Sequence, residues 1–148
     1  MENHKTWLLI ADASQAKIYS MRKARLFTST DPKELELLNQ YSHADSRKKG
    51  IDLNKDRMGE FGHGGFDDAT PPKLREAEHF AYELLHHIET GIKENHFRDL
   101  VIIAPPHFMG LLNKYMSHSV QKLVSQTIEK DYTRQSGREL MESLMTHF

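Results

Sequence analysis

The residues best suited to ligand contact lie in a glycine-rich segment, residues 59–66, just before Pro71 and Pro72. Four of the seven residues from 59 to 65 are glycine, and glycine loses more backbone freedom on ordering than any other residue. Bare main chain in a loop can approach a ligand closely, and binding residues are often carried on such loops. The alternative is a surface loop without a ligand. We predict that the contacting tip is Gly62, His63, Gly64 and Gly65.

This glycine-rich segment does not match the two common phosphate-binding patterns. It lacks the Lys-Ser/Thr pair of a P-loop, and it does not follow a strand directly as a dinucleotide fingerprint does. Any contact with a ligand is therefore expected from the backbone amides and the His63 imidazole, without a bound cofactor.

A basic stretch precedes the glycines and could contact phosphates. Its five cations are opposed by Asp52 and Asp56 alone; they are Arg47, Lys48, Lys49, Lys55 and Arg57. Lysine and arginine neutralise nucleic-acid phosphates, so these residues are candidate RNA-binding groups beside the glycine tip. The alternative is a solvated charged loop, the commoner role of a charge run. Because the formal net charge of the chain is −1, such a patch would act locally, within a Debye length.

Metal-dependent chemistry is weakly supported. His79, Glu83 and His87 are spaced four residues apart, along one side of a helix, but the His-Glu-x-x-His pattern is absent. An exposed polar face explains them better, and we expect no metal site. A nuclease could instead use Asp12, at the end of the first predicted strand, with further carboxylates to hold a divalent ion. The candidates for those are Asp99, Glu129 and Asp131.

Asp12 has a simpler interpretation that we favour. Aspartate commonly opens a tight turn because its side chain accepts hydrogen bonds from the backbone that follows. Ser14, two residues later, has no Gly-x-Ser-x-Gly context, so a hydrolase nucleophile is not indicated.

The composition is that of a globular protein without disulfides. The chain has 148 residues, of which 38% are hydrophobic and 28% charged, enough for one domain over residues 1–148 with its own core. It contains no cysteine, which excludes a disulfide framework and a thiolate zinc site. The apolar run before Asp12 is too short for a signal peptide or a membrane span. We therefore expect a cytoplasmic protein without membrane insertion.

Three strands are predicted in the first 41 residues. Residues 6–11 form a short apolar run typical of a buried strand, and residues 16–21 alternate after turn residues, so the two should form a hairpin. Residues 34–41 predict a third strand, and residues 26–28 a loop or short strand. Residues 43–70 show no periodicity, and we expect a long flexible loop there, since such segments are usually functional or disordered.

The clearest helix is predicted from Pro72 to about residue 95. Its apolar residues form one stripe at helical spacing: Leu74, Ala77, Phe80, Ala81, Leu84, Leu85, Ile88 and Ile92. Residues 99–104 predict a buried strand, so this strand and the long helix before it fit a crossover to a parallel neighbour. Pro105 and Pro106 predict a rigid strand-to-helix corner, with Phe108 filling the core.

The C-terminal part is predicted to be mainly helical. Helices are expected at residues 107–116, from residue 117 to about 125, and at residues 136–146, the last with a capping box formed by Ser136 and Glu139. Residues 126–132 fit either a helix end or an edge strand. The whole pattern predicts an α/β protein, a mixed sheet with helices packed on it.

Three ordered motifs resemble the bacterial host attachment protein family. They are Trp7-Leu-Leu-Ile-Ala-Asp-Ala-Ser-Gln-Ala-Lys-Ile-Tyr19, then Leu100-Val-Ile-Ile-Ala-Pro-Pro-His-Phe-Met-Gly-Leu-Leu112, and then Glu129-Lys130-Asp131-Tyr132-Thr133. The resemblance runs over nearly the whole chain. That family is in turn similar to the peptidyl-tRNA-hydrolysing middle domain of archaeal and eukaryotic class 1 release factors. The resemblance therefore implies the RNase-H-like sheet of that domain and of related ribosomal proteins.

In release factors a Gly-Gly-Gln tip on a loop before a long helix enters the peptidyl transferase centre. The Gly62 to Gly65 tip lies in the corresponding place, but Phe66 follows the two glycines where glutamine would stand. The resemblance thus implies a module directed to the ribosome or tRNA more than it implies catalysis. Two alternatives stay open: a protein-binding factor in host attachment or stress response without catalysis, and a metal-dependent nuclease built on Asp12.

Overall fold

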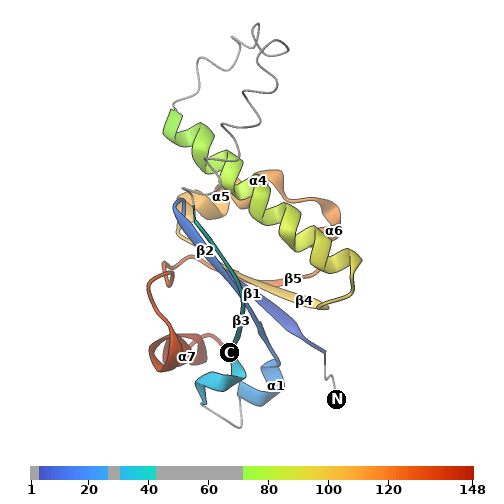
Figure 1. Cartoon of the computed structure of the whole chain (residues 1–148), viewed down its shortest axis with the longest axis vertical. Coiled ribbons are helices and arrows are strands. Elements are labelled where there is room, and N and C mark those ends of the chain that lie inside the picture. Colours follow the sequence, from blue (N-terminus) through green and yellow to red (C-terminus); the bar gives the residue numbers. More distant parts are fainter. Residues whose placement is uncertain (1–3, 27–30, 43–71) are drawn as a thin grey trace, which may run out of the picture.

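The computed structural model describes residues 4–26, 31–42 and 72–148 (Figure 1). These residues form an α/β structure around a five-stranded mixed sheet of order β3-β2-β1-β4-β5. The strands are β1 (Thr6–Ala11), β2 (Gln15–Met21), β3 (Glu36–Ser42), β4 (Asp99–Ile103) and β5 (Val124–Ile128). The predicted α/β class and mixed sheet are therefore confirmed.

The central strand β1 sets the topology. It pairs antiparallel with β2, in a register that runs from Thr6 opposite Met21 to Ala11 opposite Ala16, and parallel with β4 on its other side. β3 continues the antiparallel meander beyond β2, and β5 is parallel to β4 at the opposite edge. Every residue of β1 is buried, as expected for a strand whose two faces are both covered.

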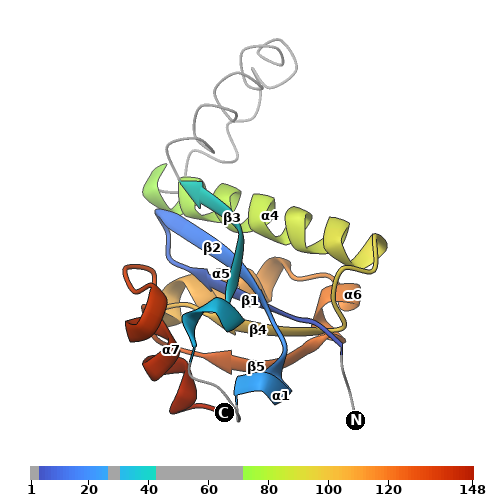
Figure 2. The same cartoon turned by 60° about the horizontal axis from the view of Figure 1, so that its bottom comes forward.

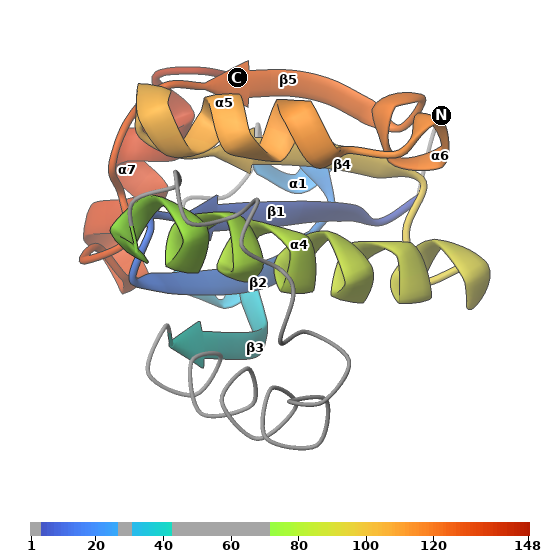
Figure 3. The same ribbon diagram turned by 90° about the horizontal axis from the view of Figure 1, so that it is seen from above.

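One face of the sheet is covered by three helices, α4 (Pro72–Lys93), α5 (Pro106–Tyr115) and α6 (His118–Gln121). Figure 3 shows α4 and α5 lying side by side along the strands. The rings of Phe80 on α4 and Phe108 on α5 meet with centroids 6.0 Å apart, and both side chains are almost fully buried. The predicted apolar stripe of the long helix and the role of Phe108 in the core are confirmed.

The other face is covered mainly by the C-terminal helix α7 (Gly137–Met145), with the short helical turns α1 (Lys23–Leu26) and η1 (Pro32–Glu34) nearby (Figure 2). α7 buries Leu140, Met141 and Leu144 against the alternate residues of the strands, such as Leu8 and Ile10. Complete burial of an aliphatic side chain contributes about 1.5–3 kcal/mol, so these contacts fix the helix to the sheet.

Several boundaries differ from the sequence-based predictions. Leu26 belongs to the helical turn α1, where the sequence predicted a loop or strand. The segment after residue 117 makes only the short α6 and then the edge strand β5. Ser136 precedes α7, but its side chain makes no capping hydrogen bond. The next residue, Gly137, has φ +58°. The backbone is therefore not helical at a position where a capping box requires helical dihedral angles.

Candidate functional site

The candidate site lies at the edge of the sheet where the three parallel strands β1, β4 and β5 end. We call this the carboxyl edge. Ligands of open α/β sheets commonly bind at such an edge. The amide of Ala104 donates to the carbonyl of Ile128 at 3.1 Å, which joins the ends of β4 and β5. α5 then starts at Pro106, after the corner that the two prolines predict.

Asp12 organises the turn between β1 and β2 at this edge. Its Oδ1 accepts hydrogen bonds from the amides of Ser14 and Gln15, at 2.7 and 2.8 Å, and from the Ser14 hydroxyl at 3.0 Å. Its own amide donates to the Gln15 carbonyl at 2.9 Å. Asp12 therefore opens a hairpin turn, as the favoured interpretation of the sequence predicts.

The second carboxylate oxygen of Asp12 links this turn to the segment after β5. Asp12 Oδ2 lies 3.1 Å from the hydroxyl of Thr133, a side chain that is almost completely buried. The same hydroxyl is 2.6 Å from Oδ1 of Asp131, which also accepts from the Thr133 amide at 3.0 Å. A threonine hydroxyl has one proton to donate, so the two carboxylates share it. The bond joins residues 121 positions apart.

Of the carboxylates proposed for a nuclease, Asp12 and Asp131 meet at the Thr133 hydroxyl, but Asp99 does not join them. Asp99 lies at the other end of the sheet, because it starts β4 and pairs in register with Thr6. There its Oδ2 meets Lys23 Nζ at 2.8 Å and accepts from the Thr6 hydroxyl at 3.0 Å. Within residues 4–26, 31–42 and 72–148, no group of three or more His, Cys, Asp or Glu side chains could hold a metal ion.

The environment of Asp99 shifts its pKa. Burial alone would raise the pKa of this carboxyl group, but hydrogen bonds from Lys23 and Ser125, the charge of Lys23 and the Thr6 hydroxyl together hold it below its ordinary value. Lys23 Nζ also donates to Ser125 Oγ at 3.0 Å. The cluster ties α1 to β4 and β5, so its role is structural.

The histidines of α4 separate into two groups. His79 Nε2 lies 3.6 Å from Glu83 Oε1, and the His79 side chain is 41% exposed, in agreement with a polar outer face. His87 does not join them, because it turns toward the sheet and stacks on Tyr41 with ring centroids 4.5 Å apart. No sequence pattern indicates this contact, because His87 has the spacing of the polar face.

The carboxyl edge also holds the two ends of the segment that the sequence analysis singled out. Ser42, the last residue of β3, pairs with Gln15 at the β1–β2 turn, and α4 begins at Pro72 beside the same turn (Figure 3). The predicted tip and the five predicted RNA-binding cations fall between these ends, outside the described residues. They are Gly62, His63, Gly64, Gly65, Arg47, Lys48, Lys49, Lys55 and Arg57.

The three sequence motifs therefore meet at one place in the fold. The first supplies Asp12, the second the corner at Pro105 and Pro106, and the third Asp131 and Thr133. The hydrogen bond between Asp12 and Thr133 was not predicted, although both residues belong to the three motifs. None of the helices in the described part of the chain is long and apolar enough to cross a bilayer.

Comparison with known proteins gives one family match. The model of a family described as "protein required for attachment to host cells" matches residues 7–144, a range that includes all three motifs. No curated protein matches the chain.

Proposed function

Because the chain belongs to the family of proteins required for attachment to host cells, we propose that it is a release-factor-like module that presents residues 43–71 to ribosomal or transfer RNA. The observation that carries the proposal is the convergence at the carboxyl edge. Three family motifs and both ends of this segment lie there, and the segment contains four closely spaced glycines and five cations.

The topology agrees with this proposal. The strand order 3-2-1-4-5, with β1, β4 and β5 parallel, is the order of an RNase-H-like sheet, the arrangement that the resemblance to release-factor middle domains implies. The candidate tip precedes the long helix α4, as the Gly-Gly-Gln tip does in those domains. With Phe66 at the glutamine position, the proposal is limited to RNA binding and includes no peptide release.

The hydrogen bonds at the carboxyl edge fix the part of the fold from which residues 43–71 extend. Asp12 fixes the β1–β2 turn against which Ser42 pairs, and Thr133 ties that turn to the chain after β5. A rigid scaffold of this kind lets a loop carry binding groups without disturbing the core. The cations would contact phosphates, and the glycines would let main chain enter a narrow space between nucleotides.

Co-sedimentation with ribosomes, and separately with tRNA, at low salt tests the proposal. The key variant changes the five segment cations to glutamine. A matched control removes the same charge from the far end of the molecule: Arg25, Lys33, Lys93, Arg98 and Lys122. The proposal predicts RNA binding by the intact protein and by the control, and strong loss in the segment variant. No binding by the intact protein, or equal loss in both variants, would contradict it.

A protein partner is the second candidate, because the family description names attachment to host cells. In that case the molecule would be a binding factor without catalysis, in host attachment or stress response. Pull-down from lysate with and without ribonuclease separates the two candidates. Partners that disappear after ribonuclease treatment support the RNA-directed function, whereas the same partners in both samples support protein binding.

A further inference from the structure

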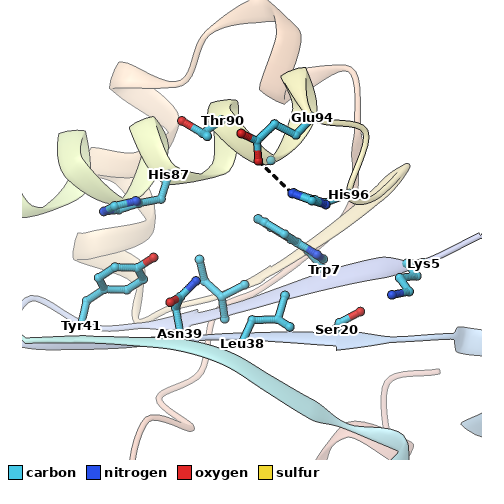
Figure 4. Close-up of a pocket in the computed structure, with 12 residues that line it drawn as sticks. Lys5, Trp7, Ser20, Leu38, Asn39, Tyr41, His87, Thr90, Glu94 and His96 are labelled. Atoms are coloured by element: carbon cyan, nitrogen blue, oxygen red, sulfur yellow. Dashed lines mark hydrogen bonds and ion pairs between the residues drawn. The ribbon is translucent and has the colours of Figure 1, made fainter.

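A pocket of about 390 Å³ lies away from the carboxyl-edge network, between the C-terminal half of α4 and the face formed by β1, β2 and β3 (Figure 4). We call it the aromatic pocket. It exists because α5 and α6 cover the β4 and β5 half of the same face of the sheet, while only α4 faces β3. Its volume falls within the range of about 300–1,000 Å³ that is typical of small-molecule sites.

One end of the pocket is built by the way α4 terminates. Asn95 adopts φ 57°, and the amide of His96 donates to the Gly91 carbonyl at 2.9 Å while that of Asn95 donates to Ile92. This is a Schellman motif, in which the left-handed residue turns the chain back on the helix. It places the imidazole of His96 nearly parallel to the indole of Trp7, with centroids 6.1 Å apart.

The other end is formed by a second aromatic pair. Tyr41 on β3 and His87 on α4 stack at 4.5 Å with an interplanar angle of 25°. Burial raises the pKa of the Tyr41 hydroxyl, so the group is neutral at physiological pH and can both donate and accept a hydrogen bond. Figure 4 shows the two aromatic pairs at opposite ends of the pocket.

A polar group lines the space between the aromatic pairs. Asn39 lies beside Leu38, and Figure 4 shows the Asn39 amide between the two ring pairs, whereas Ser20 lies next to Trp7, its cross-strand partner. An asparagine amide offers donors and an acceptor side by side, which is the complement of a heterocycle edge. Lys5 and Glu94 also line the pocket, and their opposite charges give no net attraction for a polyanion.

From this arrangement we infer that the aromatic pocket binds the flat heterocycle of a nucleoside, with the base between the two aromatic pairs and its polar edge at Asn39. Stacking on the Tyr41–His87 pair tolerates many bases, whereas the Asn39 amide selects rings with a hydrogen-bonding edge. The Trp7 ring, which is 7% exposed and stacked on Phe97, bounds the pocket on the other side of the base. The balanced charge favours a neutral nucleoside over a nucleoside polyphosphate. This inference does not depend on the proposed RNA-directed function, because the pocket uses none of the groups at the carboxyl edge.

The chain offers a built-in reporter for this site, because Trp7 is its only tryptophan and it lines the pocket. Adenosine, guanosine, cytidine and uridine are titrated separately into the full chain, and Trp7 emission is recorded together with the NMR amide resonances of Asn39 and Gly91. We expect at least one nucleoside to give a saturable response by both readouts. The corresponding triphosphate should bind more weakly.

Variants assign the response to the pocket. Asn39→Ala removes the amide from an exposed position on an edge strand, and Asn113→Ala makes the same change at an exposed position on α5. Loss of one or two hydrogen bonds predicts a dissociation constant about five- to tenfold higher for Asn39→Ala and an unchanged one for Asn113→Ala. Toluene, a flat ring without a hydrogen-bonding edge, serves as the control ligand and should bind more weakly than the nucleoside. No response to any nucleoside by either readout, equal binding of the nucleoside by both variants, or binding of toluene as tight as that of the nucleoside would overturn the inference.

Discussion

Replacing Gly91 by alanine should destabilise the protein, although the same change usually stabilises a helix. A Cβ at position 91 would lie 2.5 Å from Cη2 and 2.6 Å from Cζ3 of Trp7, and 3.0 Å from Cε1 of Phe97. Distances below 3.0 Å are not tolerated without movement, and the Trp7 ring has little room to move. It is 7% exposed and stacked on Phe97 with centroids 4.4 Å apart.

The magnitude follows from two opposing effects. Alanine in place of glycine inside a helix raises the free energy of unfolding by up to about 1 kcal/mol, whereas an extra carbon inserted into a packed core lowers it by about 1–3 kcal/mol. Gly110 on α5 provides the matched control, because a Cβ there would meet no atom within 4 Å. Gly110→Ala should therefore show the gain alone. The two variants should differ in unfolding free energy by about 1–3 kcal/mol, with Gly91→Ala the less stable.

The free energy of unfolding of both variants is measured by denaturant titration, and their Tm by heating, each followed by Trp7 emission and by circular dichroism. A difference of 1 kcal/mol corresponds to a shift in Tm of roughly 2–4 °C for a chain of this length. Emission of the native Gly91→Ala protein should also change, because the indole is displaced toward the aromatic pocket. Equal stabilisation by both substitutions would refute the close packing of Trp7 under the last turn of α4.

Two further predictions concern the two ends of the sheet. Thr133→Val should lower the free energy of unfolding by about 1–3 kcal/mol, because the buried hydroxyl that Asp12 and Asp131 share is lost. The control, Thr127→Val on the exposed side of β5, should change it by less than about 0.5 kcal/mol. Equal denaturation midpoints for the two variants would contradict this prediction. Asp99 has a lowered pKa, so its contribution to stability is present above its unfolded-state pKa and is lost as the pH falls through its folded-state pKa. The fall in unfolding free energy on acidification should be smaller in Asp99→Asn, and an unchanged acid profile would count against the Lys23 contact.

The local elements of the fold could be predicted because their signals are short-range. The apolar run at residues 6–11 matches β1 in both bounds. The stripe from Leu74 to Ile92 identifies α4 because apolar residues at helical spacing over so many turns predict an amphipathic helix from the local sequence alone. The sequence could not decide β5. Its pattern alternates between exposed and half-buried residues until the buried Ile128, so pairing with β4 determines the strand more than its own side chains do.

The candidate site was less predictable because it depends on long-range contacts. The turn role of Asp12 is local and was predicted, but its bond to Thr133 requires the ends of β1 and β5 to meet at one edge. The aromatic pocket was missed for the same reason. Tyr41 lies on an edge strand and His87 on a helix beyond a long intervening segment, and periodicity alone cannot show that a histidine with polar-face spacing turns inward.

The salt dependence of tRNA binding tests the central claim most directly, because it counts the phosphates that the protein neutralises. For single-stranded contacts the logarithm of the affinity falls with the logarithm of the salt concentration by about 0.7 per neutralised phosphate. If the segment anchored between Ser42 and Pro72 makes these contacts, replacing its five cations by glutamine should flatten the slope by about 3–4. The five-charge control should leave it unchanged. The same slope for the intact protein and the segment variant would contradict the claim.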